Sequence, residues 1–236
     1  MAGCSAYPRE IPFDAIAAIA KQYNCRLLAD ISHTAGMIAA GLHKPVSAAD
    51  FASMSLHKTM CGPRAGILLT QAHLRDGLDK AVFPGIQGAL FPQLMAAKAV
   101  CLSAARSESF GELQVRILEN ARAMAETFLA ENVALLTGGT ESHLLMVQVE
   151  AAGTAPAIVA KLARAGILTN ANYTVGDEIK TGMSGIRIGT TWISQLGFYP
   201  DHARRLAGLL VEAMHPAGNE ATLRTRLVSL VEEVLC

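Results

Sequence analysis

The run CRLLAD, from Cys25 to Asp30, is short, apolar and ends in an acid. These properties predict a buried strand whose carboxyl end meets a site. Two further short apolar runs, Phe51–Leu56 and Ile67–Thr70, predict two more strands. Because helical patterns alternate with such strands, the sequence predicts an α/β fold with a mostly parallel sheet. Ligands on such sheets gather at the carboxyl ends of the strands, which is where we expect Asp30 to lie.

Helical periodicity flanks these strands on both sides. Pro12–Tyr23 places its apolar residues on one face of a helix, and Phe91 to about Glu131 is helical with a break near Ser107–Gly111. Further along the chain we expect strands at Val133–Thr137, Leu144–Glu150 and Gly185–Ile188, and helices at Ala155–Ala165 and Pro200–Met214. We therefore predict two domains, residues 1–105 and a smaller α/β domain of residues 106–236.

Composition excludes several classes of function. Of the 236 residues, 51% are hydrophobic, 17% are charged and 5% are aromatic, with no net charge. A neutral chain without a basic stripe is not expected to bind nucleic acid, and its apolar runs are too short to span a bilayer. The five cysteines are scattered without a CxxC pair, which fits neither a disulfide framework nor a zinc site. Since Met1–Ser5 also lacks the features of a signal peptide, we expect a cytoplasmic, reducing environment.

Three groups of polar residues carry the chemistry: Asp30 with His33, the run Ser55–Thr59, and the run Gly185–Arg187. The needs of pyridoxal 5'-phosphate (PLP) explain each residue type. This cofactor needs a lysine to hold its aldehyde as a Schiff base, a carboxylate against its pyridine nitrogen and a cation for the substrate carboxylate. Lys58, Asp30 and Arg187 would supply these in turn.

Plainer interpretations of the same residues stay open on the sequence alone. A lysine after a strand is usually solvated, and Asp30 could cap a helix that begins near His33. Arg187 could pair with any nearby acid. Asp30, His33, Asp50 and His57 could be metal ligands, although no known metal-binding spacing supports this and we predict no metal. The glycines at 138–139 resemble a phosphate loop but fit a turn better.

Longer motifs resemble serine hydroxymethyltransferase, in order and over nearly the whole chain. They include LHKTMCGPR and SGIRIGT, which are highly specific. The matching segments are Gly3–Arg9, Leu28–Gly36, Leu56–Arg64, Phe83–Gly88, Gly138–Leu144 and Ser184–Thr190.

The resemblance implies the fold of an aspartate-aminotransferase-like, PLP-dependent transferase. Residues 1–105 would be the C-terminal part of its PLP-binding large domain, and residues 106–236 its small C-terminal domain. Lys58 resembles the Schiff-base lysine, and Asp30 resembles the partner of the pyridine nitrogen. Among the catalytic residues it also implies His57, which lies beside the lysine.

Further roles are implied by position in the motifs. Ser5 and His33 resemble the residues around the phenolic oxygen of the cofactor, with Ser55 nearby. Arg187 resembles the residue that binds the substrate carboxylate, and Ser5 and Arg64 are also expected near the substrate.

The family's FPG-x-QGG loop reaches across a dimer to the partner's cofactor phosphate through backbone N–H groups. Here Gly88 keeps the first glycine of its final pair and Ala89 replaces the second. The amides can still serve only if Ala89 need not adopt a positive φ.

The match begins in the middle of the family's catalytic domain. We therefore expect a separately encoded N-terminal half as partner, giving a hetero-oligomer of two such pairs, with a small amino acid as substrate. The family's Thr-Pro-Ala becomes Thr190-Thr191-Trp192, its Arg-Gly becomes Leu196-Gly197, and the loop Asn170–Thr181 is short. These departures lie near the expected pterin site, so tetrahydrofolate is a possible cofactor only.

The leading expectation is Cα–Cβ bond chemistry on serine-like amino acids, as hydroxymethyl transfer with serine or α-methylserine, which belongs to one-carbon and amino-acid metabolism. A threonine-type aldolase or transaldolase that uses an aldehyde without folate is an alternative. A non-catalytic scaffold half is another, although such a half has no need of Lys58, Asp30 and Arg187 together.

Overall fold

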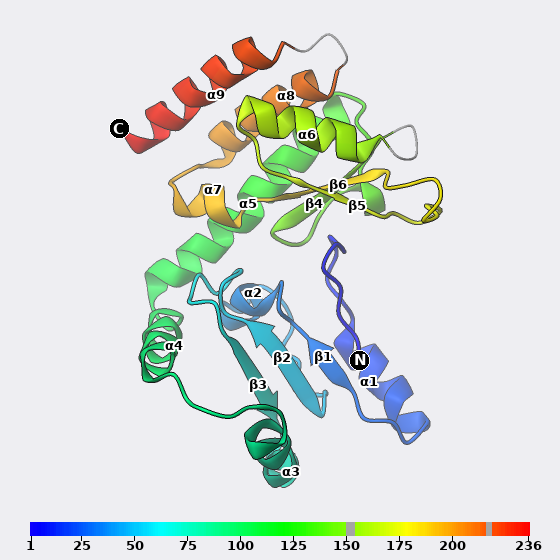
Figure 1. Ribbon diagram of the computed structural model, residues 1–236, viewed down its shortest axis with the longest axis vertical. Helices are drawn as coiled ribbons and strands as arrows, with labels where there is room; N and C mark the ends of the chain where they lie inside the picture. Colours follow the sequence, from blue (N-terminus) through cyan, green and yellow to red (C-terminus); the bar gives the residue numbers. More distant parts are fainter. Residues whose placement is uncertain (150–153, 216–218) are drawn as a thin grey trace. The chain divides into compact units, whose positions relative to one another are not determined.

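The computed structural model describes residues 1–149, 154–215 and 219–236, and Figure 1 labels its helices and strands. The described chain divides into two compact units, each with a three-stranded sheet. The first unit comprises residues 1–5 and 10–114, and the second comprises residues 6–9 and 115–236. This division falls inside helix α5 (Glu108–Ala130). The domain boundary predicted between residues 105 and 106 stays a prediction, because compact units and family domains need not coincide.

The sheet of the first unit has the order β1-β2-β3. Strands β1 (Leu28–Asp30) and β2 (Phe51–Ser55) run parallel, while β3 (Gly66–Thr70) pairs with β2 in the antiparallel direction. The three strands predicted in this unit are therefore confirmed, with β1 shorter than the apolar run that predicts it. Ala2 forms an isolated parallel bridge on the other side of β1, so this strand has backbone partners on both edges.

Helices surround this sheet and complete a small core. Helix α1 (Phe13–Gln22) confirms the helix predicted there, and its buried Phe13 joins Leu27, Ala29 and Leu56 in the core. The predicted break between helices is also confirmed, since one helix ends at Ala104 and α5 begins at Glu108. The remaining helical segments of the unit are α2 (Ala35–Ala39), η1 (Ala72–Leu74), α3 (Arg75–Lys80), η2 (Ala81–Ile86) and α4 (Pro92–Ala104).

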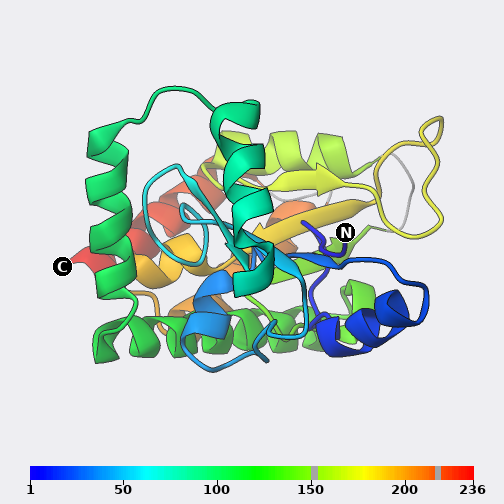
Figure 2. The same ribbon diagram turned by 90° about the horizontal axis from the view of Figure 1, so that it is seen from below.

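An extended loop connects η2 to α4. Figure 2 shows it leaving the teal helical segment and arching over to the green helix. Gly88, Ala89 and Leu90 lie in this loop and are exposed. Neither Gly88 nor Ala89 is among the described residues with a positive φ. The condition that the sequence places on Ala89 is therefore met, and alanine can occupy this position without backbone strain.

The second unit has an antiparallel sheet of order β4-β6-β5. Strand β6 (Gly185–Gly189) lies between β4 (Leu144–Gln148) and β5 (Asn170–Asn172). The predicted strands near β4 and β6 are confirmed, except that Glu150 lies outside the described residues. Strand β5 was not predicted, because its three residues, Asn-Ala-Asn, lack an apolar pattern.

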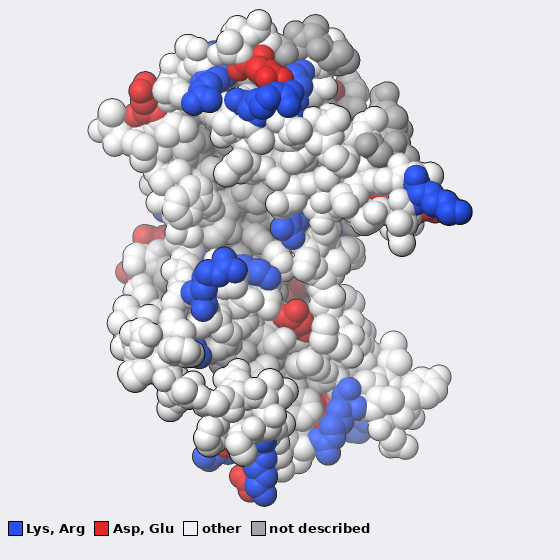
Figure 3. All heavy atoms as spheres, in the orientation of Figure 1, with Lys and Arg blue, Asp and Glu red and all other residues white. Residues whose placement is uncertain are grey.

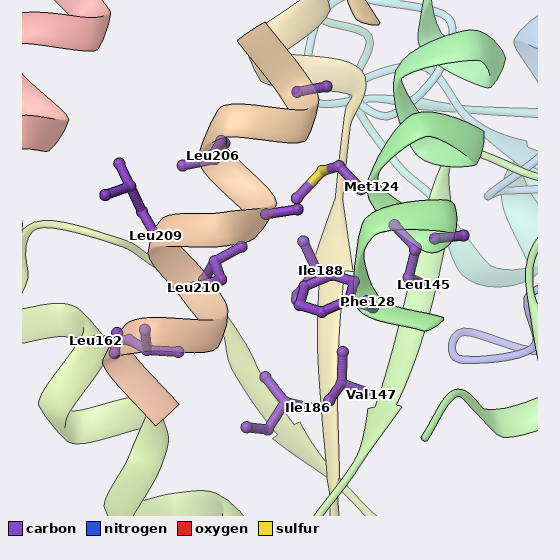
Figure 4. Close-up of a cluster of buried hydrophobic side chains, with 14 of the residues drawn as sticks. Met124, Phe128, Leu145, Val147, Leu162, Ile186, Ile188, Leu206, Leu209 and Leu210 are labelled. Atoms are coloured by element: carbon purple, nitrogen blue, oxygen red, sulfur yellow. The ribbon is translucent and has the colours of Figure 1, made fainter. Parts of the chain in front are cut away.

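Helices pack on this sheet to form the larger core, which Figure 4 shows in close-up. Met124 and Phe128 of α5 meet strand residues such as Ile188, and Leu210 comes from helix α8 (Pro200–Met214). Both predicted helices are confirmed as α8 and α6 (Ala155–Ala165). The rest are η3 (Leu136–Gly138), α7 (Thr191–Gln195) and α9 (Glu220–Leu235).

Local sequence explains where the helices of this unit begin and end. Helix α8 starts with Pro200, whose fixed φ and missing N–H suit the first turn. The side chain of Asn219 accepts hydrogen bonds from two N–H groups in the first turn of α9. Gly166 ends α6 with a φ of 96°, a left-handed conformation that glycine adopts without strain.

Two expectations from the sequence need correction. The expected strand at Val133–Thr137 is wrong, since Leu135 forms only an isolated bridge to β4. The chain then turns through η3, where Thr137 and Gly138 have positive φ values and the Arg9 guanidinium donates to the Thr137 carbonyl at 2.6 Å. Positive φ values end a strand, and here they occur at Thr137 and at the two glycines that follow it. The stretch from Gly138 to Thr140 is therefore a turn, as predicted.

The second correction concerns strand direction. The α/β composition is as expected, but only the β1–β2 pairing among the described strands is parallel. The antiparallel β3 follows β2 after a connection that contains no crossover helix, and such a connection cannot return the chain to a parallel partner. The mostly parallel sheet is thus not found within the described residues.

Charge is sparse on the surface that Figure 3 shows, where most atoms belong to neither acidic nor basic residues. None of the helices in the described part of the chain has the length and apolar character needed to cross a bilayer.

Candidate active site

Asp30 and Lys58 lie near the carboxyl ends of two neighbouring strands. Asp30 is the last residue of β1, and Lys58 lies in the turn that follows β2. Because β1 and β2 are parallel, their carboxyl ends lie at the same edge of the sheet. The positive charge of Lys58 is one cause of a lowered pKa at Asp30, which places the two side chains within electrostatic reach. The structure therefore brings together two of the three residues that PLP chemistry requires.

The Asp30 carboxylate is held by hydroxyl and amide donors. Partial burial works to raise its pKa, but hydrogen bonds from the side chain and backbone of Ser32 and from the side chain of Ser53, together with the Lys58 charge, lower the pKa overall. The Ser32 hydroxyl donates to Oδ1 of Asp30 at 2.6 Å, and the Ser32 N–H donates to the same oxygen at 3.0 Å. Asp30 is therefore ionised at neutral pH, and it does not cap a helix.

Thr59 fixes the turn that carries Lys58. Its fully buried hydroxyl donates to the carbonyl of His33 at 3.1 Å and accepts from the N–H of Gly36 at 3.0 Å. Its carbonyl accepts from the side-chain amide of Gln114 at 2.8 Å. These bonds join the lysine turn to the segment that follows Asp30.

Tight backbone contacts close the same turn. The N–H of Cys61 donates to the carbonyl of Lys58 at 2.9 Å, and the N–H of Gly62 donates to the carbonyl of Leu56 at 2.7 Å. A side chain at Gly62 would collide with the sulfur of Cys101. Part of Cys61 reaches the surface, yet burial of its thiol, and secondarily the nearby Cys101, raises the pKa of Cys61 to about 11. This thiol is therefore neutral at pH 7 and adds no charge beside Lys58.

The segment at the start of the chain lies against Asp30. The Ala2 carbonyl accepts from the Asp30 N–H at 2.7 Å. Gly3 has a φ of 155°, and a Cβ at this position would lie 2.7 Å from the Asp30 Cβ. The absence of a side chain at Gly3 therefore lets the segment pass this close to Asp30. Ser5, which was predicted to lie near the cofactor and substrate, follows two residues later and is exposed.

The other predicted residues of the first unit are placed as follows. His33 and Ser55 are partly buried near Asp30, and the Ser55 hydroxyl donates to the Ser32 hydroxyl at 3.2 Å. His57 and Arg64 are exposed, on the lysine turn and just before β3 respectively. Their catalytic and substrate roles stay predictions, as do the roles of the Gly88 and Ala89 amides.

Arg187 belongs to the second unit, so its meeting with Asp30 and Lys58 stays a prediction. It lies at the centre of β6, and its guanidinium donates to Oδ1 of Asn170 on the neighbouring strand at 2.9 Å. Gly185, two residues earlier, has no room for a side chain because Thr174 and Met146 fill the space. The strand is thus closely packed at the point that presents Arg187.

Sequence reasoning missed the residues that hold the site together, namely Ser32, Ser53, Thr59 and Gln114. One signal was available. Ser53 and Ser55 are two residues apart on β2, so a strand places both side chains on the same face. The Ser53 side chain hydrogen-bonds Asp30, which shows that this is the face on which the Asp30 carboxylate lies. Nothing in the spacing points to Gln114, which lies 55 residues from Thr59. Among the described residues, no group of three or more His, Cys, Asp or Glu side chains could hold a metal ion.

Two α/β units with an ionised acid and a lysine at adjacent strand ends have the fold class of PLP-dependent transferases, as predicted. More particularly, the chain belongs to the serine hydroxymethyltransferase family, because the model of that family matches residues 1–210. A curated serine hydroxymethyltransferase from Coprothermobacter proteolyticus is 37% identical over 237 residues. The similarity covers 99% of this chain and 57% of that relative, so the chain spans little more than half of the relative's length.

The close approach of Gly36 to the lysine turn gives a test of the site's architecture. A Cβ at Gly36 would collide with the Thr59 carbonyl, so Gly36→Ala should destabilise the chain by about 1–3 kcal/mol. Gly77→Ala is the matched control in helix α3, where a Cβ meets no atom within 4 Å. This control should be neutral or up to about 1 kcal/mol more stable. Urea unfolding followed by circular dichroism measures both, and equal midpoints for the two variants would contradict the assigned packing.

Proposed function

We propose that this chain supplies the lysine-bearing part of a PLP-dependent transferase that makes or breaks the Cα–Cβ bond of serine-like amino acids. The reaction proposed first is hydroxymethyl transfer with serine or α-methylserine. The observation that carries the proposal is an ionised Asp30 within electrostatic reach of Lys58, near the carboxyl ends of two adjacent strands. Membership of the serine hydroxymethyltransferase family supports it.

The donor set in the first unit fits PLP. Lys58 would hold the cofactor covalently through Nζ, and Asp30 would accept a hydrogen bond from the protonated ring nitrogen. Bound PLP would supply an electron sink for the pair of electrons released when the Cα–Cβ bond breaks. The lowered pKa of Asp30 matters here, because only an ionised carboxylate stabilises a proton on that nitrogen.

Other residues of the chain would hold and orient the reactants. Arg187 would bind the substrate carboxylate, since its planar guanidinium matches two carboxylate oxygens. Its hydrogen bond to Asn170 helps to orient the guanidinium on the strand. Ser5 and His33 would lie by the phenolic oxygen of the cofactor, with His57 beside Lys58. Arg64 would organise the site near the substrate.

We further propose that the active assembly includes the remaining part of the family fold as a separate, cytoplasmic polypeptide, with two such pairs in each hetero-oligomer. Large apolar side chains of the first unit support this proposal. Ile86 and Leu90 are 88% and 75% exposed, and Leu68 and Leu69 are exposed on β3. Apolar surface left in water costs about 25 cal/mol per Å², so a partner that covers these residues would be stabilising. The Gly88 and Ala89 amides would then reach the phosphate of a neighbouring cofactor.

One observation favours a second reaction, that of an aldolase or transaldolase which uses an aldehyde without folate. Trp192 stands in the segment that differs from the family pattern and is 68% exposed. Such a large aromatic side chain would alter the surface where a pterin is expected. The scaffold alternative is disfavoured, because a scaffold has no need of an ionised carboxylate held beside a lysine.

The cofactor assignment can be tested directly on Lys58. With the rest of the fold present, borohydride reduction should fix PLP onto Lys58, and peptide mapping should find the label there. Lys58→Ala should abolish both labelling and turnover, although PLP could still bind non-covalently. Lys44, an exposed lysine of the same unit, provides the control: Lys44→Ala should keep the label. A label on any other lysine contradicts the assignment.

The role of Arg187 predicts a particular kinetic change. Arg187→Lys replaces a two-pronged donor with a point charge, so kcat/KM for serine should fall roughly tenfold or more, chiefly through a higher KM. Arg164→Lys is the matched control, because Arg164 is a surface arginine that pairs with Glu220. Steady-state kinetics of both variants make the comparison. Unchanged constants for Arg187→Lys would mean that the substrate carboxylate is held elsewhere.

The partner proposal predicts that the 236-residue chain is inactive by itself. Co-expression with the polypeptide that corresponds to the other part of the family fold should give a soluble, active complex. Size-exclusion chromatography with light scattering gives the stoichiometry, and activity is assayed with PLP and serine. A monodisperse, active preparation of this chain alone would disprove the need for a partner.

Competition between acceptors distinguishes the two reactions. A hydroxymethyltransferase should need tetrahydrofolate to exchange the hydroxymethyl group of serine at a useful rate. An aldolase or transaldolase should turn over with added aldehydes and ignore the folate. Following the labelled β-carbon of serine with each acceptor separates the two, and Trp192→Ala should change folate use only if the aromatic side chain shapes that site.

A further inference from the structure

A directed chain of hydroxyl groups ends on the Asp30 carboxylate. The Ser55 hydroxyl donates to the Ser32 hydroxyl at 3.2 Å, and the Ser32 hydroxyl donates to Oδ1 of Asp30 at 2.6 Å. Because a hydroxyl has a single proton, accepting from Ser55 and donating to Asp30 uses the Ser32 hydroxyl in one defined orientation. The Ser32 N–H donates to the same oxygen at 3.0 Å. The hydroxyl and the backbone N–H of Ser32 therefore both bind Oδ1 of Asp30.

The position of these serines connects the two halves of the site. Ser55 is the last residue of β2 and precedes Lys58 by three residues, while Ser32 follows the end of β1 by two. The hydroxyl chain therefore joins the strand that leads to Lys58 to the Asp30 carboxylate. Hydrogen bonds in such a chain polarise and strengthen one another.

We propose that Ser32 is a positioning residue for Asp30: backed by Ser55, it fixes the orientation of the carboxylate and holds it ionised, ready to accept from a cationic ring nitrogen. This inference rests on the proposed function for its meaning in catalysis. The effect of the Ser32 hydrogen bond to Oδ1 on the titration of Asp30 can be measured without the cofactor.

The electrostatics of the site support this role. Burial works against an ionised Asp30, and the groups that oppose burial are the Ser32 hydroxyl and N–H, the Ser53 hydroxyl and the charge of Lys58. Removing the Ser32 hydroxyl deletes the first of these opposing groups and leaves the others. Since the lost bond stabilises the charged form, the sign is fixed: the pKa of Asp30 must rise.

The test follows the titration of Asp30 by NMR in the full chain labelled with 13C at aspartate carboxyls, with Asp30→Asn used to assign the signal. Ser32→Ala should raise the titration midpoint of Asp30, and Ser55→Ala should raise it less. Ser32→Thr keeps a hydroxyl and should restore the wild-type midpoint. Ser47→Ala, at an exposed serine of the same unit, should leave the midpoint unchanged. A wild-type midpoint in Ser32→Ala would overturn the inference, and if Ser32→Ala does not fold, the same outcome in Ser55→Ala would do so.

A second readout separates this inference from the proposed function. In the PLP-loaded assembly, Ser32→Ala should lower kcat roughly tenfold, as expected for loss of a charge-assisted hydrogen bond, with KM for serine little changed. Its pH profile should shift upward on the acid side in step with the Asp30 midpoint. Failure of the wild-type assembly to bind PLP at Lys58 would refute the proposed function, while the Asp30 titration would still decide the role of Ser32. PLP bound normally with unchanged kcat and pH profile in Ser32→Ala would refute the inference alone.

Discussion

The hydrogen bonds of Thr59 are the constraint on which the rest of the site depends. One side chain joins the lysine turn to the segment after Asp30, and its carbonyl is held from a distant helix by Gln114. Thr59 and Gln114 are both fully buried, so breaking a bond between them would leave a polar atom without water, at a cost of about 1–3 kcal/mol. The position of Lys58 is thereby fixed through its immediate neighbour in the chain.

Much of the first unit could be predicted from local sequence. The short apolar run before Asp30 indicated a strand, and the acid at its end lies where ligands collect on such sheets. Long periodic helices such as α8 were equally clear, because an apolar stripe at helical spacing over 15 residues fits a helix and does not fit a strand. The specific motifs around Lys58 and Arg187 added chemical roles that spacing alone left open.

What could not be predicted depends on contacts between residues far apart in the chain. The antiparallel direction of β3 follows from the path of the connection after β2, which hydrophobic pattern does not encode. The carbonyl of Thr137 in the turn accepts a hydrogen bond from the guanidinium of Arg9, 128 residues earlier. Ser32 looks like an ordinary loop serine until the fold places its hydroxyl on Asp30. Sequence patterns therefore indicate the residues that carry out chemistry more readily than the residues whose hydrogen bonds position them.

The neutral thiol of Cys61 has a consequence for the chemical durability of the protein. Oxidants and alkylating agents attack the thiolate form of cysteine, and a thiol whose pKa is raised to about 11 is almost entirely protonated in neutral solution. Cys61 lies three residues from Lys58 and is exposed, so it is its small thiolate fraction at neutral pH that slows its reaction with peroxide. Slow oxidation of this turn is thus a by-product of the burial of its thiol near Cys101, which raises the pKa of an exposed residue.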